Sequence, residues 1–187
     1  MLQLVIIIFP VFLYQEFWLK KDHSLDVKNF KSPILGGLCI ITGVFCISLQ
    51  LEVYEGHLFD LREVPLIISY LYGGVFSGST TLIILLLFRF GLGGDGAYVT
   101  IFTFALVTLF TLLYMRKFQH LSRKAKTAYF CFVVVASSIL KIALTAFLIS
   151  EVDPMLFLGI ALAFPIVSVV TAWSMIQLLE NIREKLR

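Results

Sequence analysis

The chain has 187 residues, of which 59% are hydrophobic and 14% are charged, and its mean hydropathy is +0.96. A soluble domain carries roughly 45–50% apolar and about 25% charged residues, so the composition predicts an integral membrane protein whose partner is the lipid bilayer. The net charge of +3 is too small for a nucleic-acid-binding surface, and nucleic acid is not expected as a partner.

Five apolar stretches are long enough to cross a bilayer, which takes about 20 apolar residues in a helix. In chain order they are residues 1–19, 33–51, 98–115, 128–150 and 154–179. The first stretch lacks a small-residue cleavage site, so we expect it to remain in the protein as a span. The predicted fold is an all-α, polytopic membrane bundle.

A sixth apolar stretch, from Val64 to Phe90, is too long for one simple crossing. Gly73, Gly74 and Gly78 lie near its middle, where glycines allow a helix to break. We predict two short helices of about 12 to 15 residues, or about 18–23 Å each, joined at Gly73-Gly74 as two thin crossings or as a re-entrant pair. The GxxxG spacing favours close helix approach. A single tilted and kinked helix is the alternative.

The distribution of lysine and arginine predicts how the chain is threaded through the membrane. Basic residues are retained on the cytoplasmic side, and they concentrate in three connections: four within residues 20–31, five within 116–126 and three within 183–187. The acidic connections 52–63 and 151–153 are then external. This arrangement requires the glycine-broken segment to return to the side that it left, with the N-terminus outside and the C-terminus inside the cell.

Three basic residues are left over by this rule. Arg62 and Arg89 lie at the two outer ends of the predicted hairpin, and Lys141 lies within the span 128–150. An ionisable group inside a membrane is unfavourable by at least a few kcal/mol and marks a partner or a function.

Lys141 has three possible explanations. It forms an ion pair with an acid of the outer side, it extends outward to water, or it contacts a ligand. The acids that are available on the outer side are Asp60, Glu63 and Asp95.

The residues at the outer ends of the hairpin form a candidate ligand site. The glycine-rich turn after Arg89 can present backbone amides to an anion. The alternative is a clamp in which Asp60 or Glu63 pairs with Arg89, and both arrangements can hold together. The candidate ligand-binding residues are Asp60, Arg62, Arg89, Gly93, Gly94, Asp95 and Lys141.

Catalytic and cofactor motifs are not found in the sequence. Gly91 to Gly96 match G-x-G-x-x-G, but membrane segments flank the match where a strand and a helix are required, so no dinucleotide cofactor is expected. The three histidines stand apart without a second ligand at zinc spacing, so no metal site is expected. We expect that this chain is not itself an enzyme.

Three motifs around the hairpin resemble the five-transmembrane receptor modules of the LytS and YhcK type. They are DLREVP from Asp60, GGxxxG from Gly73 and RxxLGGxGA from Arg89. Members of that family usually carry Asn at the position of Asp60. The resemblance implies an N-terminal membrane receptor of a bacterial sensor kinase or diguanylate cyclase, located in the plasma membrane.

A closer likeness is to the membrane region of sporulation kinase B-like histidine kinases. It is carried by FPVFLYQEFWL from Phe9, SRKAK from Ser122 and LLENI from Leu178. The likeness implies a sensor of a two-component system, with residues 1–179 as the transmembrane sensor domain and 180–187 as the start of a cytoplasmic linker helix. The kinase domain is absent, so we expect either a fragment of a longer kinase or a free-standing sensor.

The last residues of the chain favour the receptor interpretation. Apolar residues at positions 178, 179, 182 and 186 follow the helical period, which predicts an amphipathic helix that joins two copies in a homodimer. The hairpin resembles, more faintly, the substrate-capture subunits of energy-coupling-factor vitamin transporters, which supply the alternative function. The signal itself, a small molecule or a membrane protein, is not identified by the sequence.

Overall fold

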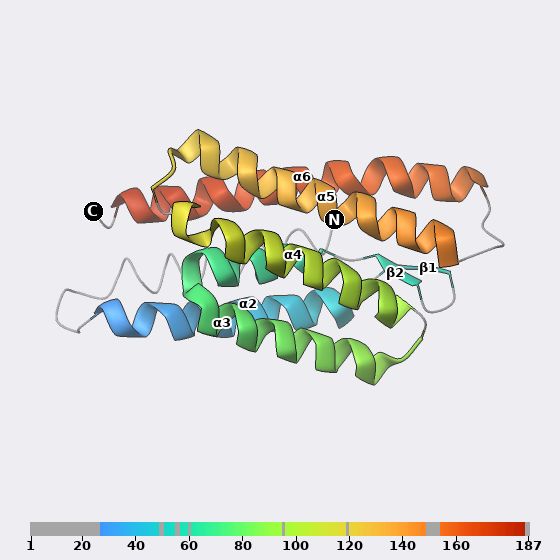
Figure 1. Ribbon diagram of the computed structural model, residues 1–187, viewed down its shortest axis with the longest axis horizontal. Helices are drawn as coiled ribbons and strands as arrows, with labels where there is room; N and C mark the ends of the chain where they lie inside the picture. The colour runs from blue at the N-terminus through green and yellow to red at the C-terminus, as the bar shows by residue number, and fades with distance from the viewer. Residues whose placement is uncertain are drawn as a thin grey trace.

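The computed structural model describes residues 27–48, 51–54, 57–59, 61–94, 96–118, 120–148 and 154–185. Helices lie side by side along the long axis and form one bundle (Figure 1), which confirms the predicted all-α fold. The predicted span 1–19 lies outside the described residues. The elements are α2 (Val27–Ser48), β1 (Leu51–Tyr54), β2 (His57–Phe59), α3 (Glu63–Leu92), α4 (Gly96–Phe118), α5 (Arg123–Leu148) and α6 (Pro154–Lys185).

Four helices of the described part of the chain are long and apolar enough to cross a membrane. They are α3, α4, the part of α5 from Arg123 to Phe147 and the part of α6 from Ala161 to Asn181. The apolar part of α2, Ile34–Ser48, is shorter. A polytopic membrane protein follows from these helices.

The helix boundaries follow from local sequence. Ser122 precedes α5, and its hydroxyl accepts a hydrogen bond from the backbone N–H of Ala125 at 3.4 Å, as an N-cap residue does. Pro154 opens α6 and Pro65 lies in the first turn of α3, where a missing N–H removes no helical hydrogen bond. Gly93 ends α3 with a φ of 71°, a conformation that glycine adopts without strain.

α3 is broken in the way that its glycines predict. Gly74 has φ 87° and ψ 178°, and at this residue the chain reverses direction. The hydroxyl oxygens of Ser69 and Thr81 are 2.9 Å apart. In a straight helix, residues twelve positions apart would be separated by about 18 Å, so the two halves of α3 lie against each other as a hairpin.

Gly78 lies where the two halves of α3 pack closely. A Cβ atom at Gly78 would lie 2.2 Å from Cδ1 of Tyr70, a distance that no side chain could tolerate. The predicted role of Gly78 in close helix packing is therefore confirmed, as is the turn at Gly73-Gly74. The alternative of a single kinked helix is wrong.

The two arms differ in length, whereas the sequence predicted similar ones. The short arm, residues 63–73, is about 16 Å long and the long arm, residues 75–92, is about 27 Å long at 1.5 Å per residue. The difference arises because the glycine pair lies nearer the start of the helix and because helix continues through the Arg89 turn to Leu92. Side chains 61–71 are all buried, so protein surrounds the short arm as its broken backbone requires.

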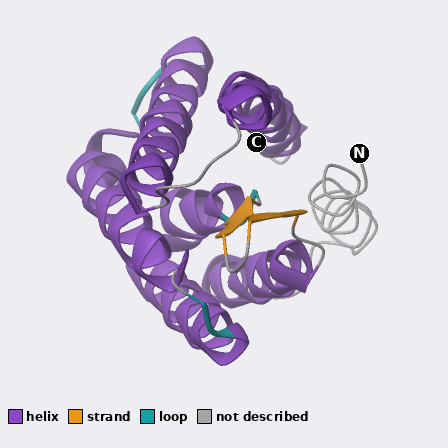
Figure 2. Ribbon diagram, turned by 90° about the vertical axis from the view of Figure 1, so that its right-hand side faces the viewer, coloured by secondary structure: helices purple, strands orange, loops and turns teal. Residues whose placement is uncertain are grey.

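The connections between the described elements gather at two opposite ends of the bundle (Figure 1). The α4–α5 connection, the reversal of α3 and the end of α6 lie at one end, and β1, β2 and the α3–α4 turn lie at the other. Figure 2 looks onto the second end, where the antiparallel strands β1 and β2 cross in front of the helices. We name these the inner end and the outer end, after the orientation that the basic residues predict.

The strand pair was not predicted from the sequence. It occupies the connection 52–63, whose alternation of charged and apolar residues is short, and β1 begins at Leu51, which the sequence assigned to the preceding span. The two strands form most of the connection between α2 and the short arm.

Candidate functional site

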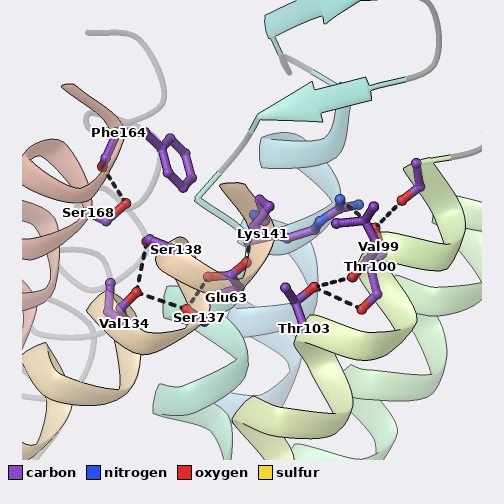
Figure 3. A network of polar contacts seen from close by, with 12 residues as sticks. Glu63, Val99, Thr100, Thr103, Val134, Ser137, Ser138, Lys141, Phe164 and Ser168 are labelled. Atoms are coloured by element: carbon purple, nitrogen blue, oxygen red, sulfur yellow. Dashed lines mark hydrogen bonds and ion pairs between the residues drawn. The ribbon is translucent and has the colours of Figure 1, made fainter. Parts of the chain in front are cut away.

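A buried ion pair joins the beginning of the short arm to α5. Nζ of Lys141 lies 2.6 Å from Oε1 of Glu63, and both side chains are 4% exposed. Figure 3 shows the Glu63 carboxylate between Lys141 and Ser137, one helical turn apart on α5. The ion-pair explanation of Lys141 is thus confirmed, with Glu63 as the acid.

Ser137 completes the carboxylate site. Its hydroxyl donates a hydrogen bond to Oε2 of Glu63 at 2.6 Å, so each carboxylate oxygen faces a donor on α5. Nζ of Lys141 also lies 5.0 Å from the ring centroid of Phe164 on α6, within cation–π distance. The pair therefore brings α3, α5 and α6 together at one point.

Arg62, the neighbour of Glu63, turns toward α4. Its Nη2 donates to Oγ1 of Thr100 at 3.0 Å, and its Cζ lies 5.6 Å from the ring centroid of Phe104. Arg62 and Glu63 thus contact two neighbouring helices, α4 and α5, from adjacent positions. We call Arg62, Glu63, Ser137 and Lys141 the outer cluster.

Arg89 lies near the end of the long arm. Its Nη1 donates to the carbonyl oxygen of Gly93. Gly93 and Gly94 both have positive φ, 71° and 83°, and Ala97 N–H donates to the Gly94 carbonyl at 3.1 Å, so the glycines form the tight turn that leads into α4.

The structure places part of the predicted site, and its role as a ligand site stays a prediction. Arg62 and Arg89 are 2% and 1% exposed, so the bundle encloses both side chains. Glu63 pairs with Lys141, and a clamp between Asp60 and Arg89 stays a prediction. Asp60 and Asp95 lie outside the described residues. In the described part of the chain, no group of three potential metal ligands occurs.

A second group of charges lies at the inner end. Nζ of Lys126, in the first turn of α5, is 3.1 and 3.0 Å from the two carboxylate oxygens of Glu180 on α6. The hydroxyl of Tyr72, next to the reversal of α3, donates to Oε1 of Glu180 at 2.9 Å. We call Tyr72, Lys126 and Glu180 the inner cluster.

α6 continues beyond the last predicted span. It is helical to Lys185, so residues 180–185 extend the same helix. Leu179 is buried in the core and Leu178 is half-buried against it, so the first two positions of the predicted dimer stripe pack within this chain. The homodimer through the last helix stays a prediction, and so does the domain boundary at residue 179.

Sequence reasoning missed the inner cluster because Lys126 was counted among the cytoplasmic basic residues and Tyr72 among apolar ones. Glu180 stood in a polar tail and gave no signal of burial. The contribution of Ser137 had a signal, because a hydroxyl at i−4 from a buried lysine lies on the same helix face.

Together, these features define a polytopic helical membrane protein with a broken hairpin and charged groups buried at both of its ends. A family model described as the 5TMR of 5TMR-LYT matches residues 11–182. The chain belongs to this family, the receptor module of LytS-type histidine kinases. Neither a curated protein nor a solved structure was found to match the chain.

Proposed function

We propose that this chain senses a signal for a bacterial two-component histidine kinase, binding it at the outer end and transmitting it through α6. The family match carries the receptor assignment. The outer cluster supports the location of the signal site, because buried charges in a membrane bundle are unfavourable unless they serve a structure or a function.

The arrangement of the outer cluster supports a switch between two packings. Arg62 contacts α4, whereas Glu63 contacts α5, whose Lys141 approaches α6. A signal that binds one packing of these helices more tightly than another shifts the population between them. The short arm, enclosed by protein and too short to span a bilayer, is the element that we propose to move.

Substitution of the two buried arginines tests the signal site. In cells that carry the full-length kinase and a reporter of its response regulator, growth media are screened for one that switches the reporter. Arg62→Ala and Arg89→Ala then abolish the switch while the amount of protein in the membrane stays normal. Arg116→Ala, at an exposed position of the inner end, retains it.

Arg62→Lys and Arg89→Lys guard against a simple loss of folding, since lysine keeps the charge but not the planar fork of donors. Should both alanine variants respond as the unmodified protein does, the arginines are no part of the signal site.

The open reading frame beyond Arg187 separates the receptor from its alternative most simply. A receptor is followed in frame by a kinase domain, whereas a transporter capture subunit copurifies with a small molecule and an ATPase-driven partner. The role in sporulation stays a prediction that depends on the short sequence matches at Phe9, Ser122 and Leu178.

A further inference from the structure

The short arm has a buried polar contact at each of its ends. At the outer end Glu63 pairs with Lys141 of α5, and at the inner end Tyr72 donates to Glu180 of α6. Because the arm between them is a single helical segment, a displacement of its first residues is carried to Tyr72. Among the described elements, α5 makes most of the contacts with α6, and α3 makes a few.

Tyr72 is positioned firmly for this contact. Its ring packs edge-on against Phe118 of α4, with centroids 5.6 Å apart. Nζ of Lys126 lies 5.5 Å from the centroid of the same Phe118 ring. The side chains of Tyr72 and Lys126 thus both contact the Phe118 ring and both reach the Glu180 carboxylate.

α5 holds the same end of α6 independently of the hairpin. Nη2 of Arg123 donates to Oδ1 of Asn181 at 2.7 Å and to the carbonyl oxygen of Gln177 at 3.3 Å. The α5 contacts come from a neighbouring helix that lies alongside α6 over its length. The Tyr72 hydroxyl comes from the hairpin, so it can report the position of the short arm.

We propose that the hydrogen bond from Tyr72 to Glu180 is the contact through which the hairpin controls the rotation of the C-terminal end of α6. In one packing the hydroxyl holds Glu180 and fixes the rotation of α6. When the short arm is displaced, the hydroxyl leaves the carboxylate, and α6 adopts a second rotation against α5. This regulation rests on the proposed function, because it assigns an output to a movement that begins at the signal site.

Tyr72→Phe tests the proposal with little disturbance, because the ring and its packing on Phe118 are kept. Tyr129→Phe is the matched control, since Tyr129 also lies at the inner end but its hydroxyl donates to the Phe110 carbonyl at 2.6 Å and not to α6. Autophosphorylation of the full-length kinase is measured in membrane vesicles without added signal. The expected change in Tyr72→Phe is at least about tenfold, the lower limit of the factor that a hydrogen bond to a charged group contributes.

A second measurement follows α6 directly and needs neither a ligand nor a kinase domain. Spin labels are placed at Phe76→Cys, beside the reversal, and at Trp173→Cys on α6, both exposed positions. Their distance distribution is measured in lipid nanodiscs. The three native cysteines, Cys39, Cys46 and Cys131, are first replaced by alanine.

The proposal expects a shifted or broader distance distribution in Tyr72→Phe and an unaltered one in Tyr129→Phe. It is overturned if Tyr72→Phe matches the unmodified protein in either measurement, or if Tyr129→Phe changes both to the same extent. Failure of the proposed function has a different signature. In that case Arg62→Ala and Arg89→Ala leave the response intact while Tyr72→Phe still moves α6.

Discussion

The two ends of the short arm use similar chemistry in different surroundings. At the outer end, Glu63 and Lys141 form an ion pair inside membrane-spanning helices, with Ser137 as a third partner. At the inner end, Lys126 and Glu180 form an ion pair at the first turn of α5; both side chains are also buried, 5% and 8% exposed, but Lys124 and Asn181, close to them in the chain, are exposed.

This difference bears on the free energy that is needed to separate the two charges of a salt bridge. A buried charge that loses its partner deep in the bundle has no water to replace it, so separating the two charges is strongly unfavourable. A pair whose neighbours along the chain are exposed and polar, as Lys124 and Asn181 are, can be opened and rehydrated at lower cost. The outer cluster is therefore expected to stay closed unless a specific signal rearranges it. The inner cluster is expected to open and close more readily.

The largest expected effect comes from removal of the outer cation. Lys141→Met leaves the Glu63 carboxylate buried beside an apolar side chain, and we expect the free energy of unfolding to fall by about 3–5 kcal/mol. Unfolding of the purified protein in detergent by a denaturant titration measures this change. The double variant Glu63→Gln with Lys141→Met recovers most of the loss, because a neutral pair leaves no buried charge.

Lys124→Met provides the control for Lys141→Met. Lys124 lies in the same helix but is exposed, so we expect a change of less than about 0.5 kcal/mol. Equal stability of the two lysine variants would contradict the assignment of Lys141 to a buried pair.

A smaller effect is expected from the serine that supports the pair. Ser137→Ala removes the hydrogen bond to Glu63, which we expect to contribute about 1.5–3 kcal/mol because the acceptor is charged. Ser138 is equally buried, and its hydroxyl donates to the Val134 carbonyl at 2.8 Å. Ser138→Ala should therefore cost less than about 1 kcal/mol, and the same denaturant titration compares the two. A larger loss of stability in Ser138→Ala than in Ser137→Ala would contradict the assignment of Ser137 as the hydroxyl that supports the ion pair.

The smallest effect is expected at the inner end. Lys126→Met should lower the free energy of unfolding by about 1–2 kcal/mol, less than Lys141→Met although this pair is also buried, because Glu180 keeps the hydrogen bond from Tyr72 and lies beside the exposed Asn181. Lys117→Met, at an exposed position, is the control in the same titration. A loss as large as that of Lys141→Met would show that the inner cluster is as inaccessible to water as the outer one, and would remove the contrast between them.

Much of the fold could be predicted from the sequence because membrane physics restricts it strongly. Apolar length identified the described helices, and the sorting of basic residues required the segment around Gly74 to reverse. The lengths of the arms could not be predicted in the same way. They depend on where Tyr70 can pack against Gly78, which is decided by contact between the arms and not by hydropathy.

The candidate site could be predicted only in part. A lone Lys141 in an apolar run predicts that some acid faces it, but the choice of Glu63 requires the angle at which the short arm meets α5. Tyr72 and Glu180 are separated by 108 positions, and neither is unusual in its local sequence. Their contact follows from the reversal at Gly74, which brings the hairpin tip to the exit of α6.

Burial of the short arm also has a consequence for biogenesis. A helix of about 16 Å that begins with Arg62 and Glu63 is a poor substrate for independent insertion into lipid. Its counter-charge, Lys141, is synthesised 78 positions later than Glu63. Docking of the arm therefore has to wait until α5 leaves the translocation machinery, which makes the hairpin one of the last parts of the bundle to reach its final place.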